Sequence, residues 1–524
     1  MHPKTSALCA IQLLALWFFL PTTAMAGNCP STVPDATGRF TVVISDLHFG
    51  VGRDKDGAWD PTEDFRWSNA LQGFVDRISS CGHDAVDLVI DGDFLELWQP
   101  PKGIACKGAN DDTACTLVEA EALVRLVVQQ HAADLKALGR FADKGTNRLV
   151  VIPGNHDAAL MLDGLWSIVS EAMATKSNRV ERVSRGLWVS SDGRLLVEHG
   201  HQIGKDVNRF DAWPSVTRQV GAETYLVRPW GELFVQDLFN EQEREYSIID
   251  NLSPESAGAR YRMADRGLWK SVSDVARFVQ FNLFETSLRQ KALALGKTDD
   301  PKLPPPWDLV LARARGYQLF SLALPADDPF VKSLLDTSNE KSGELRESLT
   351  ALARDAEKLP DADVKLLCDQ IAIVSGPEHL CVKAPLGSLV QTLLMSKRAV
   401  IAKHLNDRIG TEKLAYMRVF VYAHTHQLEE EWTVDPRPGR RVHVYNTGAF
   451  QRLVSEEGFL KRARREDLSP AQALKKLTVK SLAPCYSAVV VALGPVVPSA
   501  KTEVWLMDED GTGEFTSPKD ARCL

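Results

Sequence analysis

Residues 40–48 read FTVVISDLH, a run of β-branched and aromatic residues that ends in Asp46 and His48. Such a run is typical of a buried strand, and polar residues at its carboxyl end stand where α/β sheets place their functional sites. Four further strand-like runs end in the same way, and their polar residues are Asp93, Asn155 with His156, His199, and His424 with His426. The sequence therefore predicts one site assembled from five strand ends.

The residue types at these strand ends are those that bind divalent metal ions. Asp46 and His48 are two residues apart, as are His424 and His426, so each pair can point in a common direction. Carboxylates, imidazoles and an asparagine carbonyl suit zinc, manganese or iron, and the set is large enough for two ions. A lone Asp-x-His can belong to a hydrogen-bonded core, but five such pieces at five strand ends favour a metal site.

Residues 28–160 alternate between strand and helix patterns, which predicts βαβ units and a largely parallel sheet. The expected strands here are 40–46, 86–91 and 148–153, and the expected helices are 65–81 and 117–142. We also expect an apolar helix after Asp157. Short strands are expected at 187–190 and 194–198, and strand patterns return at 417–424, 429–435, 440–448, 485–493 and 502–508. We expect the strands after residue 415 to close a second sheet against the first, which gives an α/β fold of two sheets with helices outside.

Helical periodicity replaces the strand patterns between residues 205 and 412. The helical segments are 228–247, 256–295, 306–322, 341–357 and 386–407. A block of this length between two site-bearing strands must leave the sheet and return beside it, so we expect a cap over the site. A purely structural helical annex is the alternative. The expected division is a leader over 1–26, one domain in two parts over 27–204 and 413–524, and a helical insertion over 205–412.

The first 26 residues have the features of a secretory signal peptide. Lys4 precedes an apolar run from Ala7 to Leu20, and the segment ends in Ala24-Met25-Ala26. The apolar run is shorter than the roughly 20 residues of a membrane-spanning helix, which argues against the alternative of a retained anchor. We therefore expect a periplasmic or secreted protein without a stable membrane span after signal cleavage.

The charge balance of the chain is mildly acidic. The formal net charge is −8, and removal of Lys4 with the leader would make it −9. A nucleic-acid binder usually carries a basic patch or an excess of positive charge, so no nucleic-acid partner is expected.

Cysteine usage agrees with an oxidising compartment. The chain has nine cysteines, and loss of Cys9 with the leader would leave an even eight, which suggests up to four disulfides. No CxxC pair occurs, so we do not expect cysteine metal ligands. The near neighbours give the pairs Cys106–Cys115 and Cys368–Cys381, and elimination leaves Cys29–Cys81 and Cys485–Cys523.

Five motifs together resemble the calcineurin-like metallophosphoesterase superfamily in their order and approximate spacing. They are Asp46-Leu47-His48, Gly92-Asp93, Gly154-Asn155-His156-Asp157, Glu198-His199-Gly200 and Ala423-His424-Thr425-His426. The resemblance covers about residues 40–205 and 415–450, and it implies a two-sheet sandwich flanked by helices around a binuclear metal centre.

Matching motif to motif, the resemblance implies a role for each ligand. Asp46, His48 and His426 would hold one ion, Asn155, His199 and His424 would hold the other, and Asp93 would bridge them. Family members place glycine directly after the histidine of the fourth block and directly before the bridging aspartate. We therefore prefer His199 to His201 and Asp93 to Asp91.

The resemblance also implies a reaction. A hydroxide shared by the two ions would attack phosphorus in line with the leaving oxygen. His156 would stand beside the leaving group as a proton donor, and Glu96, three residues after the bridging aspartate, would orient it. A structural role for His156, as a hydrogen-bond donor to a phosphate oxygen, is the alternative.

Differences from the motifs of individual subfamilies narrow the choice of subfamily and therefore of reaction. The arginine clamp of phosphoprotein phosphatases is absent, and Glu96 stands where purple acid phosphatases have a tyrosine. The run GDFLELW, with Asn446-Thr447-Gly448 after the last block, is most similar to the branch that contains UDP-2,3-diacylglucosamine pyrophosphohydrolase. That substrate is not carried over, because His156 replaces an arginine often seen there and an export signal separates the protein from cytosolic lipid precursors. Ala423 also stands in place of a usual glycine.

Residues shortly after the fourth block suggest a substrate class. A basic and aromatic rim at the entrance would suit a small phosphorylated substrate with an apolar or ring-bearing group, whereas the alternative places the tryptophans in a helix-packing core. The residues concerned are Lys205, Asn208, Arg209, Trp213, Arg228 and Trp230.

The favoured interpretation is an exported, metal-dependent hydrolase of phosphomonoesters or phosphodiesters. A non-catalytic envelope binding protein on the same scaffold is the first alternative, and the presence of His156 argues against it because binding needs no proton donor. A secreted nuclease is the second alternative, and the acidic charge balance argues against it.

Overall fold

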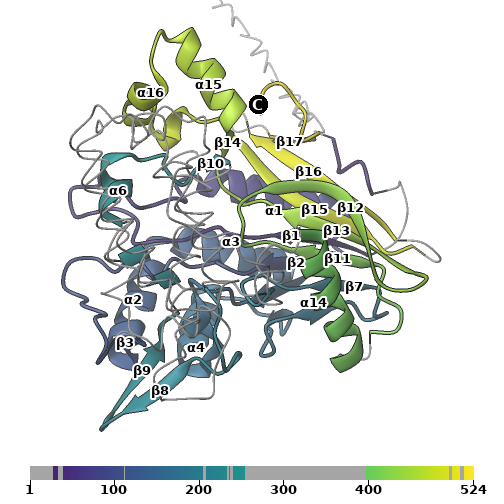
Figure 1. The fold of residues 1–524 in the computed structure, drawn as a ribbon, viewed down its shortest axis with the longest axis horizontal. Coiled ribbons are helices and arrows are strands. Elements are labelled where there is room, and N and C mark those ends of the chain that lie inside the picture. Colours follow the sequence, from purple (N-terminus) through teal and green to yellow (C-terminus); the bar gives the residue numbers. More distant parts are fainter. Residues whose placement is uncertain are drawn as a thin grey trace, which may run out of the picture.

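The computed structural model describes most of the chain outside residues 1–27 and 254–396. The described residues are 28–33, 39–110, 112–204, 208–229, 231–232, 235–236, 240–253, 397–412, 414–494, 498–507 and 513–523. They form an α/β sandwich of two sheets with helices on the outer faces (Figure 1). The predicted fold class is confirmed.

The larger sheet has seven strands in the order β17-β16-β15-β1-β2-β4-β5. Their bounds are β1 Phe40–Ile44, β2 Val86–Asp91, β4 Arg148–Ile152, β5 Val180–Arg182, β15 Cys485–Ala492, β16 Ser499–Met507 and β17 Gly513–Thr516. Strands β1, β2, β4 and β5 run parallel, with Val43 opposite Val89 and Val89 opposite Val150. The carboxyl ends of β1, β2 and β4 therefore meet at one edge, as the alternating pattern predicts.

The smaller sheet has five strands in the order β12-β13-β11-β7-β6. Their bounds are β6 Trp188–Val189, β7 Leu195–Val197, β11 Val419–Tyr422, β12 Leu428–Arg437 and β13 Arg440–Thr447. Strand β11 runs parallel to both β7 and β13. The ends of β7 and β11, which lead to the other predicted ligands, are therefore neighbours.

The prediction that all strands after residue 415 form the second sheet is wrong for β15, β16 and β17. Strand β15 pairs antiparallel with β1, with Thr41 opposite Val491. Its residues are apolar on both faces: Val490 packs toward the helices and Val491 packs between the sheets. A strand of this kind needs a layer on each side, and the free edge of β1 in the larger sheet provides both.

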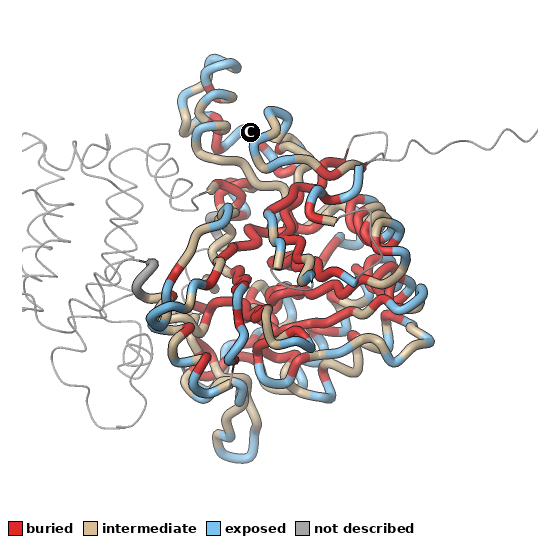
Figure 2. The backbone as a smooth tube through the Cα atoms, turned by 90° about the vertical axis from the view of Figure 1, so that its right-hand side faces the viewer, coloured by how far each residue is buried: buried red, intermediate tan, exposed pale blue. Residues whose placement is uncertain are grey.

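Three apolar layers of the core follow the alternation of the strands in the two sheets. Figure 2 shows that buried residues lie mainly in the interior of the described chain. Val43 and Val89 of the first sheet meet Val421 of the second between the sheets. The outer face of the first sheet is covered by α1 Ser68–Cys81, α2 Leu117–Gln130, α3 Ala132–Asp143 and α4 Asp163–Ala172. Helix α14, Lys397–Thr411, covers the outer face of the second sheet through Ile401 and Leu405.

The single helix expected over 117–142 is two helices, because the chain breaks at His131. The His131 ring is buried and stacks on Phe49 with 4.4 Å between ring centroids and 10° between planes. Its two nitrogens lie 3.4 Å from Glu63 Oε1 and 3.3 Å from Asp134 Oδ2. The break places this imidazole between two buried carboxylates.

Small elements complete the described chain. They are β3 Thr113–Thr116, β8 Thr217–Val220, β9 Glu223–Val227, β10 Leu252–Ser253, β14 Val454–Ser455, α6 Asn240–Glu245, α15 Glu456–Arg465, α16 Pro470–Lys476 and two 3₁₀ turns at Ala158–Met161 and Val479–Ser481. Strands β8 and β9 form a hairpin that also pairs with β3.

The hairpin shows that the purely helical pattern expected from residue 205 onward is wrong for residues 217–227. Gly221, with φ of +61°, and Ala222 form its two-residue turn between Val220 and Glu223. Glycine in the first position of such a turn is a known hairpin signal. The expected helices 256–295, 306–322 and 341–357, and the first part of 386–407, lie outside the described residues, as does the leader.

Three of the four expected disulfides are present: Cys29–Cys81, Cys106–Cys115 and Cys485–Cys523. Cys368 and Cys381 lie outside the described residues. Within the described part of the chain, none of the helices combines the length and the apolar character needed to cross a bilayer.

Candidate metal centre

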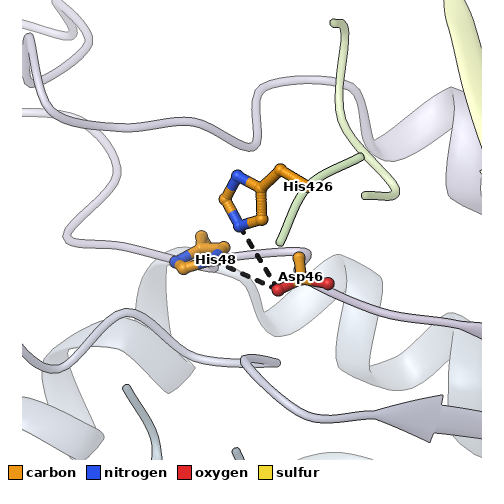
Figure 3. A group of neighbouring side chains, drawn as sticks. All are labelled: Asp46, His48 and His426. Atoms are coloured by element: carbon orange, nitrogen blue, oxygen red, sulfur yellow. Dashed lines mark ion pairs between the residues drawn. The ribbon is translucent and has the colours of Figure 1, made fainter. Parts of the chain in front are cut away.

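The strand ends gather the predicted ligands into two neighbouring trios. In each trio one possible ligand atom per residue lies within 4.8 Å of the others. Figure 3 shows the first trio, in which the imidazoles of His48 and His426 turn toward the carboxylate of Asp46. The trios are Asp46, His48 and His426, and Asp93, His199 and His424.

Asp93 belongs to the second trio and also faces the first. Its Oδ2 atom is 3.0 Å from His199 Nε2 and 3.9 Å from His48 Nε2. The Asn155 side-chain oxygen is 3.1 Å from the same His199 nitrogen. All seven predicted metal ligands therefore belong to one connected group that joins residues nearly 400 positions apart in sequence, since Asp46 meets His426.

The backbone at the ligands is unusual. Asp46, His48, Asp93, His424 and His426 all have positive φ, between 48° and 73°. Such left-handed conformations are unfavourable for residues other than glycine by roughly 1–3 kcal/mol each, and they cluster at functional sites. The strand ends thus hold a strained geometry that the surrounding sheets must stabilise.

Two glycines in the motifs make room for the ligands. A Cβ atom at Gly92 would overlap the ring of His199, and a Cβ atom at Gly154 would overlap the carboxylate and backbone of Asp93. Gly92 also has φ of +83°. The glycine that precedes Asp93 and the glycine that precedes Asn155 are therefore steric requirements of the site.

Hydrogen bonds fix which nitrogen of two imidazoles faces the centre. His199 Nδ1 donates to the backbone carbonyl of Asp91 at 2.7 Å, and His48 Nδ1 lies 2.9 Å from Glu96 Oε2. Nε2 is then the nitrogen of both rings that faces Asp93, and it is the atom that would coordinate a bound ion. A hydrogen bond on the far nitrogen is the usual way in which proteins orient a histidine ligand.

The buried polar atoms of the first trio are suited to a cation. Within the described part of the chain, neither carboxylate oxygen of Asp46 accepts a hydrogen bond of normal geometry, and His48 Nε2 has no partner. Asp46 is fully buried and His48 is 4% exposed. Buried groups of this kind are unfavourable unless something pairs with them, so carboxylate and imidazole donors here fit a borderline divalent ion.

The pKa shifts of Asp46 and Asp93 also agree with a cation site. Burial alone would raise the pKa of Asp46, but His426 holds it below its ordinary value. Burial would likewise raise the pKa of Asp93, but His199 and His156 hold it well below its ordinary value. Both side chains are therefore carboxylates in the folded protein.

His156 and Glu96 adjoin the trios. Glu96 Oε2 lies 2.6 Å from His156 Nδ1 and also contacts His48, so one carboxylate oxygen joins the two imidazoles. Burial would lower the pKa of His156, but Glu96 and Asp93 raise it to about 9. Burial would raise the pKa of Glu96, but His156 and His48 lower it to about 2.

The sequence comparison agrees with this geometry. Residues 41–281 match the calcineurin-like phosphoesterase family. The matched range includes Asp46, Asp93 and His199, while His424 and His426 lie beyond it and reach the centre through the fold. No curated protein and no solved structure matches the chain.

The two residues that we do not expect to be metal ligands, His201 and Asp91, lie outside both trios. The His201 ring packs edge-on against Trp213, with 4.5 Å between centroids, and His201 belongs to neither trio. The carboxylate of Asp91 is fully buried and makes no hydrogen bond within the described residues, and burial raises its pKa well above the ordinary value. Burial therefore favours the neutral form of the Asp91 side chain.

Three supporting contacts were not predicted from the sequence. Asp157 accepts hydrogen bonds from the backbone N–H groups of Gly154, Phe94 and Leu95, which ties two ligand loops together. The only signal for it is its place at the end of the third motif.

The other two contacts brace the second sheet. Glu198, next to His199, pairs with His404 and Arg408 of α14. The side-chain amide of Asn446 donates to the Ala423 carbonyl and to Thr425, which supports the last ligand loop. Ala423 is fully buried and its φ is not positive, so this position has no need of glycine.

The structure describes four of the six residues expected at the entrance. Arg209 and Trp213 line a cleft of about 620 Å³ between the loop after His201 and α14, and Asn208 lies 3.4 Å from His424 Nε2. The expectation for Arg228 is wrong, because Arg228 is 4% exposed, donates to the backbone of Cys106 and Lys107 and lies 3.5 Å from Glu232. Lys205 and Trp230 lie outside the described residues.

Proposed function

We propose that this protein is an exported, metal-dependent hydrolase that cleaves phosphomonoesters or phosphodiesters. The observation that carries the proposal is that Asp93, a member of the second trio of possible ligand atoms, also faces His48 of the first. A single carboxylate oxygen that faces an imidazole of each trio is suited to bridge two ions. The family match over residues 41–281 supports a metal-dependent phosphoester hydrolase.

We propose that the seven residues hold two ions, divided as the motif resemblance implies. Asp46, His48 and His426 would hold one ion, and Asn155, His199 and His424 would hold the other, with Asp93 shared. A pair of divalent ions makes water nucleophilic near neutral pH and withdraws charge from phosphoryl oxygens. The mixture of oxygen and nitrogen donors suits manganese, zinc or iron.

His156 is proposed as the proton donor to the leaving group. Its Nδ1 atom is held by Glu96, and its side chain is 16% exposed, so Nε2 is the atom that can meet a substrate. In the reaction a water oxygen forms the new bond to phosphorus, the bond from phosphorus to the leaving oxygen breaks, and Nε2–H protonates that oxygen. The proton is regained from the attacking water, so the net reaction consumes one water.

The surroundings support a small phosphorylated substrate with an apolar or ring-bearing group. Arg209 and Trp213 offer a cation and an aromatic face in the cleft beside the fourth motif. A substrate of the UDP-2,3-diacylglucosamine type is one member of this class, but His156, in place of an arginine often seen in that branch, and the signal-like residues 1–26 argue against it. Three disulfides and the signal-like residues 1–26 support export.

An ester assay tests the proposal. Protein purified without chelator should hydrolyse p-nitrophenyl phosphate or its diester when manganese or zinc is added, and Asp93→Asn should lower kcat/KM at least about 1,000-fold, because it removes the shared ligand. Asparagine tolerates the positive φ of Asp93 as well as aspartate does, so the backbone is not strained further.

A matched control is Asp76→Asn. It changes an exposed aspartate of α1 that pairs with Lys144, and it should keep full activity. Wild-type protein that binds metal and phosphate esters without turnover would contradict the proposal and favour a binding protein. Hydrolysis of nucleic acid faster than of small esters would favour the nuclease.

A further inference from the structure

Trp98 lies directly against His156. The indole and imidazole rings are stacked, with 4.0 Å between centroids and 27° between planes. Trp98 is 4% exposed, and its backbone N–H donates to Glu96 Oε1 at 2.6 Å. The same short segment therefore contributes the acid that holds the imidazole edge and the aromatic ring that covers its face.

These contacts leave His156 one unoccupied atom. Glu96 takes Nδ1, Trp98 covers one face, and His48 meets the ring edge-on with 4.6 Å between centroids. The His156 backbone N–H donates to Asp93 Oδ1 at 2.9 Å. Nε2 makes no hydrogen bond to the residues that the structure describes, and it points away from Glu96 because the two nitrogens lie on opposite sides of the ring.

The torsion that turns an imidazole about its Cβ–Cγ bond is soft, because that sp³–sp² torsion has broad minima. One hydrogen bond at Nδ1 permits the ring to tilt about the bond to Glu96. A stacked indole opposes that tilt, because it would have to move out of its buried position. A displacement of about 1 Å at a reacting atom can change a rate about 100-fold, so this restraint matters for proton transfer.

We propose that Trp98 is a positioning residue that holds His156 Nε2 toward the leaving oxygen of the substrate. The inference rests on the proposed function and deepens it. It assigns Trp98 no contact with substrate or metal. Its effect passes through His156 alone.

This role predicts a dependence on the leaving group that a packing role does not. Proton donation matters most when the leaving oxygen is strongly basic, as in alkyl esters, and least when it is weakly basic, as in p-nitrophenyl esters. Trp98→Met removes the flat ring but keeps an apolar side chain. It should lower kcat/KM about tenfold or more for alkyl phosphates and less than about threefold for p-nitrophenyl phosphate.

Three further variants make the result specific. Trp98→Phe keeps an aromatic face and should restore most of the wild-type pattern. Trp505→Phe changes a tryptophan of the core that is 1% exposed, and it should lower stability without changing the ratio between the two esters. In a His156→Ala background, Trp98→Met should have no further effect on alkyl esters, because its target is gone.

The outcomes separate this inference from the proposed function. Wild-type protein without turnover of any ester overturns the proposed function, and the inference falls with it. Active wild type together with an equal loss for both esters in Trp98→Met, or a further loss in the His156→Ala background, overturns the inference alone. If Trp98→Met does not fold, Trp98→Leu is judged by the same ratio.

Discussion

Asp46 and Glu63 are both buried carboxylates, with exposed fractions of 0% and 1%, but their surroundings differ. Glu63 accepts hydrogen bonds from three backbone N–H groups, and His131 lies on its other side. Asp46 accepts no hydrogen bond of normal geometry within the described residues, although His426 Nε2 is 3.3 Å from one of its oxygens.

The difference separates a structural charge from a ligand. The backbone and His131 stabilise the charge of Glu63 as water would, so the folded protein needs nothing more there. The charge of Asp46 is left to be balanced by its histidine neighbours and a cation. A buried side chain that has no hydrogen-bond donor, but whose pKa neighbouring imidazoles still hold low, is therefore a stronger sign of a metal site than burial alone. Asp91 lacks the second feature, because burial raises its pKa.

Of these two carboxylates, Asp46 should have the larger effect on activity when it is replaced. Asp46→Asn should lower kcat/KM at least about 100-fold and weaken metal binding, because the first trio loses its anionic ligand. In chelator-treated protein the same change should be neutral or stabilising, because a buried charge disappears and asparagine accepts the φ of 50°. Activity assays and chemical unfolding with and without chelator measure both effects, and loss of metal-free stability would contradict the comparison.

Glu63→Gln should show the opposite pattern. It leaves His131 and three backbone N–H groups facing a neutral side chain, so it should reduce the free energy of unfolding by roughly 2–4 kcal/mol. Metal content should stay at the wild-type level. Urea unfolding together with metal analysis distinguishes the two variants, and a Glu63 variant that loses metal but not stability would show that the two carboxylates have been assigned the wrong way round.

The pH dependence of stability should report the same network. Burial would lower the pKa of His131, but Asp134 and Glu63 raise it to about 9 from an ordinary 6.5. A raised folded-state pKa stabilises the protein fully below about pH 6.5, and this contribution is lost as pH rises through about 9. The stability difference between wild type and His131→Gln should therefore shrink by up to about 3 kcal/mol between pH 6 and pH 9.5.

Subtraction of the variant isolates the contribution of His131 from that of His156, whose pKa is also raised to about 9. A difference that stays constant between pH 6 and pH 9.5 would show that His131 is neutral in the folded state.

Glu198 provides the smallest and finest test. It lies next to His199 but is paired with His404 and Arg408, so it resembles Glu63 and not Asp46. Glu198→Gln should reduce the unfolding free energy by roughly 1–3 kcal/mol and change kcat/KM less than about threefold. A large loss of metal from this variant would mean that the α14 contact sets the position of the ligand.

The elements that sequence predicts well are those specified by local patterns. The runs before Asp46, Asp93 and Asn155 are apolar on both faces, which identifies buried parallel strands, and their polar ends share one sheet edge by topology. The expected strand 86–91 has the same bounds as β2, so this pattern predicts even the ends of a strand. Convergence of the ligands then follows from the fold class.

The features that sequence does not predict depend on contacts between distant segments. Strand β15 suits either sheet by its composition, and only the free edge of β1 decides between them. The break at His131 places its ring beside Glu63, a carboxylate of a distant segment, as well as Asp134 of the helix that follows. The pairing of Glu198 with α14 joins residues more than 200 positions apart, and no local pattern encodes it.

Metal analysis of protein purified without chelator tests the central claim most directly. The account predicts about two equivalents of manganese, iron or zinc per chain, with the content reduced in Asp93→Asn and Asp46→Asn and unchanged in Glu63→Gln. A chain that takes up less than about a tenth of an equivalent, or that binds the same amount after Asp93 is replaced, would contradict it.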